Sequence, residues 1–187
     1  MNQYDVGLYD PPWDYEVWSK DTGQGRSAEA HYPTMTIDEI CALPVGELFA
    51  DNAALFLWVT MPSMFENAPR VFEAWNFTYR TTAFVWVKAK RDHTGFHFGM
   101  GHYTRANAEL CLLGVRGSMP VADKGVGQLV YAPVTKHSQK PEEVHQKIER
   151  LYPGKRYLEG FARRPYPGWD VFGNEVENSI SLNGAKT

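Results

Sequence analysis

The run AALFLWVT at residues 53–60 is the feature that most constrains the fold, because it has strand length and carries no charge. A strand with one wet face alternates apolar and polar residues, whereas a strand covered on both faces is apolar throughout. The run therefore predicts a central strand with other elements packed on both of its faces.

Strand-like and helix-like segments alternate along the rest of the chain. A helix is expected at 36–43, where Thr36 and Glu39 form a capping-box pattern, and two more at 62–75 and 140–152. The alternation predicts an α/β fold with a mostly parallel sheet and helices on both faces. Further strands are expected at residues 4–9, 79–88, 108–115, 128–132, 156–162 and 169–175.

A chain of 187 residues fits one domain. We expect that domain to span residues 1–177, and the small, polar residues of 178–187 to form a flexible tail. Two long polar loops, 14–35 and 89–106, interrupt the regular elements. Loops of this length in compact domains commonly carry function.

The formal net charge is −3 and the pI is near 6.1, so contact with nucleic acid would need a local basic patch. Cys41 and Cys111 lie in apolar segments without metal-ligand or redox spacing, and we expect buried free thiols in a reducing cytoplasm. A basic leader and a long apolar stretch are both missing. We therefore expect a cytoplasmic protein without a signal peptide or a membrane span.

The stretch DPPW at residues 10–13 follows the first expected strand, and ligands of parallel sheets bind at such carboxyl ends. A following proline pushes both Asp10 and Pro11 into extended geometry, and neither proline has an N–H group. The carboxylate and nearby carbonyls form a stiff array of acceptors, and Trp13 adds a flat ring. This array fits a planar ligand that bears an amino group, although a surface turn with a packed tryptophan is the plainer alternative.

The exocyclic amine of adenine is such a ligand, and it is a poor nucleophile because its lone pair is delocalised into the ring. Hydrogen bonds from its protons to fixed acceptors would localise that lone pair, which is electrostatic preorganisation without full deprotonation. Chemistry on the base requires that the base leave the stack.

Several segments, taken in order, resemble the MT-A70-like family of adenine-N6 methyltransferases. They are DPPW (10–13), LFLWVT (55–60), HSQKPEE (137–143) and GWDVFGNE (168–175), supported by HYPTM (31–35) and ELCLLGVRG (109–117). The resemblance implies a Rossmann-like methyltransferase fold with circularly permuted, β-class motif order. It also implies that S-adenosylmethionine is the cofactor and that nucleic acid is the substrate.

The resemblance assigns the catalytic motif to Asp10, Pro11, Pro12 and Trp13. Asp10 would accept from the target amine near the methionine end of the cofactor, and Pro11 would add a carbonyl acceptor. Trp13 would stack on the flipped base or form a wall beside it. Tyr32 would contact the base, or else serve in packing.

The resemblance also implies a set of cofactor contacts. Lys140 would reach the cofactor's carboxylate, with a solvated lysine as the alternative, and Ser138 would contact cofactor or substrate, or cap a helix. Gly160 stands where an aliphatic residue is common, and Glu175 where some relatives have glutamine. Positions near the cofactor's ribose and adenine are matched by Glu159, Phe161, Arg163, Asn174 and Glu175.

The basic residues Lys88, Arg91 and Arg105 in and beside loop 89–106 are expected to face the substrate, with a solvated loop as the alternative. A metal site is not expected, because the histidines of the loop are not accompanied by the acidic residues and cysteines of a zinc site. Those histidines are His93, His97 and His102.

DNA is favoured over RNA by analogy with small bacterial and phage enzymes. An RNA adenine-N6 enzyme stays open, as does a DNA cytosine-N4 enzyme, although serine usually replaces Asp10 there. The chain could also be an inactive partner subunit that binds nucleic acid, but such subunits tend to lose the acid, the tryptophan or the lysine. A homodimer or a heterodimeric partner could supply target recognition.

Overall fold

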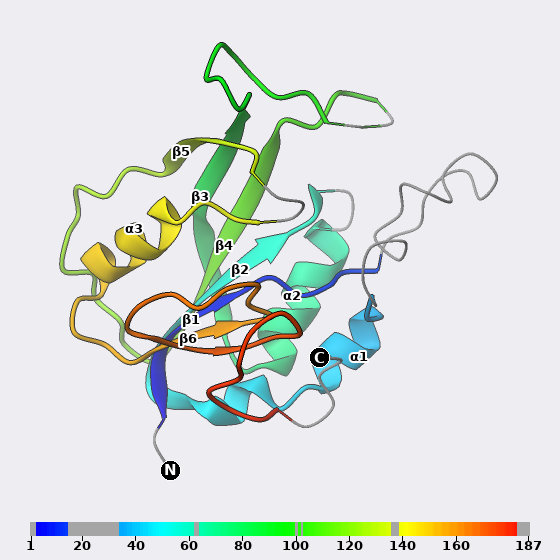
Figure 1. Cartoon of the computed structure of the whole chain (residues 1–187). Coiled ribbons are helices and arrows are strands. Elements are labelled where there is room, and N and C mark those ends of the chain that lie inside the picture. Colours follow the sequence, from blue (N-terminus) through cyan, green and yellow to red (C-terminus); the bar gives the residue numbers. More distant parts are fainter. Residues whose placement is uncertain are drawn as a thin grey trace.

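The computed structural model describes residues 3–14, 34–61, 64–99, 101, 103–135 and 139–182. Within these residues, seven strands form one sheet (Figure 1). The strands are β1 (Tyr4–Tyr9), β2 (Phe49–Val59), β3 (Thr78–Ala89), β4 (Ala108–Arg116), β5 (Leu129–Pro133), β6 (Tyr157–Gly160) and β7 (Trp169–Phe172). The helices are α1 (Ile37–Ala42), the 3-10 helix η2 (Val45–Leu48), α2 (Met64–Ala74) and α3 (Glu143–Leu151).

The sheet is mixed, with strand order β5-β3-β4-β2-β1-β6-β7. Strand β4 runs antiparallel to both of its neighbours, β2 and β3, while the other adjacent pairs are parallel. The expected α/β class and the predominance of parallel pairing are therefore confirmed. Because β1 lies between β2 and β6, the carboxyl end of β1 opens between two parallel neighbours.

Helices cover both faces of the sheet, as the apolar run in β2 predicts. Leu55 and its same-face neighbours pack with Phe72 of α2, whereas Phe56 points the other way and packs with Ile148 of α3. The period of two in a strand sends successive side chains to opposite faces, so one run of β2 serves two cores. The sequence signal of a strand without a wet face thus has a direct structural cause.

Most element boundaries agree with expectation within a few residues. The capping box of α1 is present: the Thr36 side chain accepts from the Glu39 backbone N–H at 3.2 Å, and the Glu39 carboxylate accepts from the Thr36 N–H at 2.8 Å. Strand β2 begins earlier than predicted, at Phe49, and helix α2 continues through Pro69.

The first part of the predicted tail packs against the domain. The backbone N–H of Ser179 donates to the Val171 carbonyl at 2.8 Å, and Leu182 belongs to the same buried cluster as β2. Residues 183–187 lie outside the described part. The domain limit at residue 177 stays a prediction, while the packed chain extends to Leu182.

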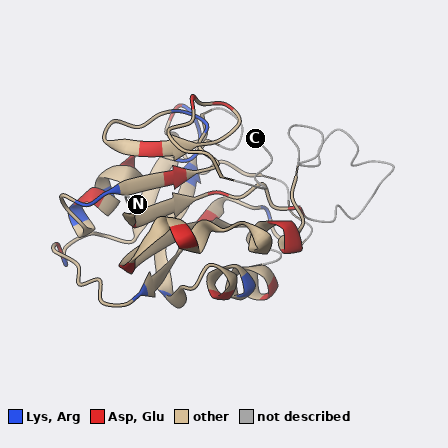
Figure 2. Cartoon of the chain, turned by 90° about the horizontal axis from the view of Figure 1, so that it is seen from below, with Lys and Arg blue, Asp and Glu red and all other residues tan. Residues whose placement is uncertain are grey.

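Charged residues of both signs are interspersed along the chain (Figure 2). Cys111 is a buried free thiol as expected, whereas Cys41 is free but only partly buried. No described helix has both the length and the hydropathy that crossing a bilayer requires.

Candidate active site

Asp10 stands at the carboxyl end of β1, where its backbone N–H donates to the Gly160 carbonyl at 3.4 Å. The two prolines that follow use their carbonyls to fix the chain. The Pro11 carbonyl accepts from the Trp13 N–H at 2.8 Å, and the Pro12 carbonyl accepts from the Met35 N–H at 2.9 Å. Each carbonyl has a second lone pair, so the predicted acceptor array is rigid and still able to accept.

Trp13 is buried, with 5% of its surface exposed, and its indole Nε1 donates to the Trp58 carbonyl at 3.0 Å. This hydrogen bond ties the motif to the end of β2. The ring therefore anchors the motif within the core, and its predicted stacking on a base stays a prediction. Tyr32 and Ser138 lie outside the described residues.

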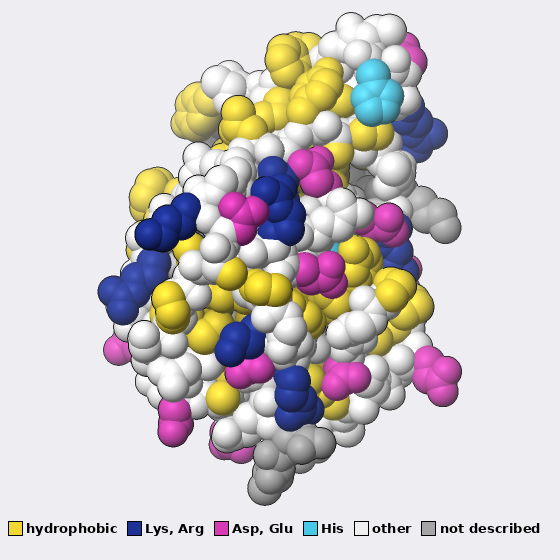
Figure 3. Space-filling model, turned by 90° about the vertical axis from the view of Figure 1, so that its left-hand side faces the viewer, with side chains coloured by type: hydrophobic (Ala, Val, Ile, Leu, Met, Phe, Trp, Pro, Cys, Tyr) yellow, Lys and Arg dark blue, Asp and Glu magenta, His cyan; other side chains and the backbone are white. Residues whose placement is uncertain are grey.

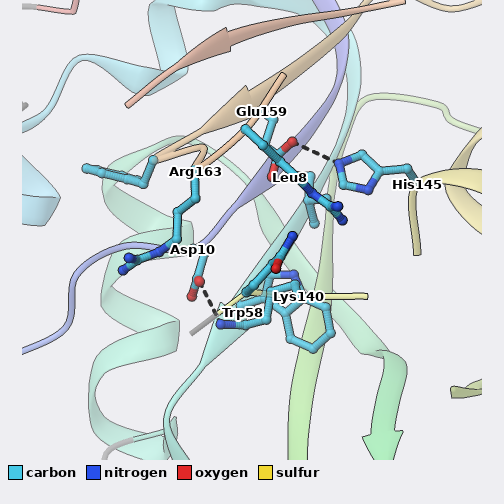
Figure 4. A pocket seen from close by; sticks show the side chains of 10 residues that line it. Leu8, Asp10, Trp58, Lys140, His145, Glu159 and Arg163 are labelled. Atoms are coloured by element: carbon cyan, nitrogen blue, oxygen red, sulfur yellow. Dashed lines mark hydrogen bonds and ion pairs between the residues drawn. The ribbon is translucent and has the colours of Figure 1, made fainter. Parts of the chain in front are cut away.

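Lys140 lies just before α3 and points at Asp10 (Figure 4). Its Nζ donates to the Asp10 carboxylate at 2.6 Å and lies 3.2 Å from the carboxylate of Glu109 in β4. Glu109 in turn pairs with Lys88 of β3 at 2.5 Å. The result is a chain of alternating charges that runs from Lys88 on β3 through Glu109 on β4 and Lys140 to Asp10 at the end of β1.

Burial and neighbouring charge set the protonation of this chain. Burial raises the pKa of the Asp10 carboxyl, although Lys140 opposes the shift. Burial acts to lower the pKa of Lys140, but the carboxylates of Asp10 and Glu109 outweigh it and raise that pKa. Burial likewise raises the pKa of Glu109, but Lys140 and Lys88 together bring it below the usual value. Lys140 therefore stays an ammonium at neutral pH, and Asp10 is a stronger base than an exposed carboxylate.

A second polar pair lies beside the first, formed by Glu159 of β6 and His145 of α3. The His145 Nε2 is 2.8 Å from the Glu159 carboxylate, and the imidazole stacks on Tyr166 with ring centroids 4.2 Å apart. The edge of Trp169 closes the remaining side at 4.9 Å. The imidazole is thus clamped, and it fixes the orientation of the Glu159 carboxylate.

One pocket joins the two polar pairs, with a volume of about 400 Å³ that includes its open mouth. Two pocket residues, Trp58 and His145, each have a buried ring nitrogen that lacks a hydrogen-bond partner among the described residues. The wall is formed by Leu8, Asp10, Trp58, Gln139, Lys140, His145, Glu159, Phe161, Arg163 and Arg164.

The predicted cofactor residues are only partly brought together. Arg163 lines the pocket and pairs with Glu175 at 2.7 Å, so Glu175 reaches the wall through the arginine. Asn174 is exposed in the turn after β7 and does not line the pocket. Phe161 has φ 61°, a left-handed conformation that is rare for a bulky residue and costs about 1–3 kcal/mol. Its ring packs against Phe172 with centroids 5.4 Å apart.

Gly160 has a packing explanation. A Cβ atom at this position would collide with the ring of Tyr9, which is fully buried beside it. The large side chain on β1 fills the space that an aliphatic residue on β6 would take. The departure from the family pattern at Gly160 therefore belongs to the core rather than to the pocket.

The three predicted substrate-facing cations have different environments. Lys88 is engaged with Glu109, and Arg91 donates to the Thr135 carbonyl at 3.0 Å. Arg105 is exposed in the connection between β3 and β4. Among the described residues, no three His, Cys, Asp or Glu side chains gather as a metal site would need. His102 lies outside those residues.

Sequence reasoning missed Glu109 and His145. Glu109 left a signal, since it is a carboxylate next to an apolar strand run and such residues need a partner when buried. His145 left a weaker one, because it follows Val144 on a helix whose apolar residues mark one buried face. Only the fold could show that His145 lines the pocket and that Glu109 reaches it through Lys140.

The polar groups in the pocket suit a ligand with a carboxylate, vicinal hydroxyls and a flat ring. Lys140 offers an ammonium, Glu159 offers an acceptor, and Phe161 offers a ring face. Residues 4–175 match the protein family MT-A70.

The chain belongs to the MT-A70 family. It is 34% identical over 197 residues to a type II methyltransferase, M.MunI, of Mycoplasma sp, covering 96% of this chain and 81% of that protein. It is 32% identical over 181 residues to the METTL3 subunit of N(6)-adenosine-methyltransferase of Danio rerio and to the catalytic METTL3 subunit of Homo sapiens. Both matches cover 95% of this chain and 29% of the relative, so the chain spans less than a third of those proteins.

Proposed function

We propose that the chain transfers a methyl group from S-adenosylmethionine to N6 of adenine in DNA. The observation that carries the proposal is the Asp10 carboxylate at the end of β1, held 2.6 Å from Lys140 in the wall of the pocket. Membership of the MT-A70 family supports the reaction type. The fold proposed with it is the Rossmann-like methyltransferase fold in circularly permuted order, with the motif strand β1 first and the cofactor strands β6 and β7 last.

When bound, the cofactor supplies an electrophilic methyl group. Lys140 would hold its carboxylate, and Glu159, oriented by His145, would accept from its ribose hydroxyls. Phe161 and Arg163 would border its adenosine part, with Glu175 steadying the arginine and Asn174 reaching in from the turn. The two orphaned ring nitrogens of the pocket support a polar ligand of this kind, since unpaired buried polar atoms are costly.

Lys140 has a second consequence for Asp10. The Lys140 ammonium cannot pair equally well with the Asp10 carboxylate and with a cofactor carboxylate. Binding of the cofactor would therefore weaken the contact between Lys140 and Asp10. The freed Asp10 Oδ2 would accept a hydrogen bond from the adenine amine, and the Pro11 carbonyl would accept from its other proton. Asp10, with its raised pKa, would then receive the proton that the methylated nitrogen loses.

DNA is proposed as the substrate because one relative, of which the chain covers 81%, is a type II methyltransferase, a class that acts on DNA. RNA is the second candidate, favoured by the METTL3 relatives at similar identity. Asp10 argues against cytosine N4, and the intact Asp10–Lys140 pair argues against an inactive subunit. A cytoplasmic location, and a homodimer or partner subunit that completes target recognition, stay part of the proposal.

The test is product identity. The chain is incubated with isotopically labelled S-adenosylmethionine and with either DNA or RNA of the same sequence, and the nucleosides are then resolved by mass spectrometry. We expect labelled N6-methyladenine, with more product from DNA. Label in N4-methylcytosine, or no label with either polymer, would contradict the proposal.

A further inference from the structure

The Asp10 carboxylate, the proposed acceptor for the adenine amine, is already occupied by Lys140. Among the described residues, Lys140 is the one hydrogen-bond donor to this carboxylate, with its Nζ 2.6 Å from the Asp10 Oδ2. The side chains of Lys140 and Asp10 are only 12% and 24% exposed, so little water competes for the contact. An amine that donates to Oδ2 would therefore have to displace a nearly buried ammonium.

Burial distinguishes this pair from the ion pairs of the surface. Figure 3 shows basic and acidic side chains next to one another over one face of the molecule. Among the surface pairs, Arg150 and Asp123 are also 2.6 Å apart, but their side chains are 58% and 36% exposed. Water and salt screen exposed pairs, whereas separating a buried pair leaves a charge without compensation. The Asp10–Lys140 contact therefore opens when another group takes the ammonium.

Glu109 holds Lys140 independently of Asp10. One carboxylate oxygen of Glu109 lies 3.2 Å from the Lys140 Nζ, and the other lies 2.5 Å from the Lys88 Nζ. An ammonium has three N–H donors, so Lys140 can release one carboxylate while it still donates to another. Glu109 thus serves as a fixed pivot from which the lysine can turn away from Asp10.

The pocket gives Lys140 a second place to bind an anion. Lys140, Asp10 and Trp58 all line the pocket, and the Lys140 Nζ lies 5.5 Å from the centre of the Trp58 ring. The face of this ring attracts the charge and adds a partner that does not depend on Asp10. A carboxylate that enters the pocket competes with Asp10 for the same ammonium. A ligand without an anionic group would leave the Asp10–Lys140 contact intact.

We propose that the Asp10–Lys140 ion pair is an autoinhibitory contact that imposes an order of binding. The carboxylate of S-adenosylmethionine takes Lys140 first, while Glu109 keeps the lysine on its other side. The released Asp10 oxygen then accepts from the adenine amine, so the base is held at Asp10 only after the cofactor has bound. The inference rests on the proposed function for the identity of the two ligands, and it adds the coupling between them.

The test measures how cofactor analogues change the binding of adenine. Fluorescence anisotropy follows a labelled oligodeoxyadenosine with saturating S-adenosylhomocysteine, which keeps the carboxylate, or with saturating methylthioadenosine, which lacks the amino-acid part. We expect S-adenosylhomocysteine to raise the affinity for the strand at least about fivefold, the lower end of the usual coupling between sites, and methylthioadenosine to leave it unchanged. A strand with unsubstituted purine in place of adenine has no amine to donate, and its affinity should be the same with either analogue.

Lys140→Met removes the contact from the side of the lysine. Asp10 is then open without any cofactor, so this variant should bind the adenine strand equally with and without saturating S-adenosylhomocysteine. Lys147→Met is the matched control and should keep the full coupling, because Lys147 pairs with Glu143 and does not line the pocket. Thermal unfolding checks that each variant folds, and the comparison of the two analogues in the wild type needs no variant.

Equal strand affinity with the two analogues would overturn the inference, because Asp10 would then be open before a carboxylate arrives. Undiminished coupling in Lys140→Met would also overturn it, since the effect would then come from the cofactor itself. The labelled-cofactor assay separates this inference from the proposed function. Methyl transfer without coupling would refute the inference alone, and coupling without methyl transfer would refute the proposed function alone.

Discussion

Lys140 decides what the other charged residues of the pocket can do, because its ammonium lies between the carboxylates of Asp10 and Glu109. It also lies 5.5 Å from the ring centre of Trp58, a cation–π distance. Three partners of negative character keep the lysine charged while it is almost buried. A carboxylate that enters the pocket would find this charge already in place.

Lys140→Met keeps the length of the side chain and removes its charge. We expect the affinity for S-adenosylhomocysteine, measured by calorimetry, to fall by about tenfold or more, since a hydrogen bond to a charged group contributes about 1.5–3 kcal/mol. Lys147→Met on α3 is the matched control, because Lys147 pairs with Glu143 and does not line the pocket. Equal affinities in all three proteins would remove Lys140 from the cofactor site.

His145 is a positioning residue, because it reaches the pocket chemistry through Glu159. His145→Ala should raise the KM for the cofactor several-fold while kcat changes less, because Glu159 loses the group that orients it. His145→Gln should restore much of the loss, since its amide can also donate to the carboxylate. A fall in kcat alone, or no rescue by glutamine, would show that the imidazole acts otherwise.

At the scale of elements, periodicity was enough to find most strands and helices. The apolar run of β2 indicated two covered faces, and the capping box at Thr36 marked the start of α1. Strand direction was not readable, because side-chain alternation is the same in parallel and antiparallel strands. Because β4 runs antiparallel to its neighbours, Glu109 lies beside Lys140. The sequence does not reveal the direction of β4, so it could not predict this ion pair.

The sequence indicated site residues that belong to a motif within one segment. It did not indicate contacts that join residues from two separate elements. Asp10 and Lys140 were expected to serve one cofactor, but their direct contact depends on the packing of α3 against the sheet. The indole N–H of the buried Trp13 donates to the carbonyl of Trp58, which lies on a separate strand, β2. Contacts between distant elements are set by the tertiary fold, which no local pattern records.

Glu109 on β4 should also make stability depend on pH. Its pKa lies below the usual 4.5, so its ionised form stabilises the fold above that value and the gain is lost as pH falls through the lowered pKa. Glu109→Gln should therefore cost about 1.5–3 kcal/mol of unfolding free energy at neutral pH. In denaturant titrations, the difference from wild type should shrink as pH falls through the lowered pKa of Glu109, where its side chain becomes neutral like that of glutamine. A difference that is constant with pH would contradict this assignment.

At the scale of the whole molecule, one region of the sheet concentrates the chemistry. The carboxyl end of β1, the pocket beside α3 and the β3–β4 connection follow one another through the chain of charges from Asp10 to Lys88. Under the proposed function, the cofactor would bind in the pocket on one side of Asp10. The chain of charges also implies an order, because Asp10 becomes available to a base once Lys140 has a different carboxylate to bind.

The most direct measurement compares Asp10→Asn with the wild type in two assays on the same preparations. The first quantifies N6-methyladenine formed in DNA by mass spectrometry, and the second measures S-adenosylmethionine affinity by calorimetry. We expect product formation to fall by at least about 10²-fold, as for loss of a preorganised polar group at a reacting centre. Cofactor affinity should hold or rise, because Lys140 is released from Asp10. Retained methylation by Asp10→Asn would contradict the assignment of Asp10 as the catalytic acceptor.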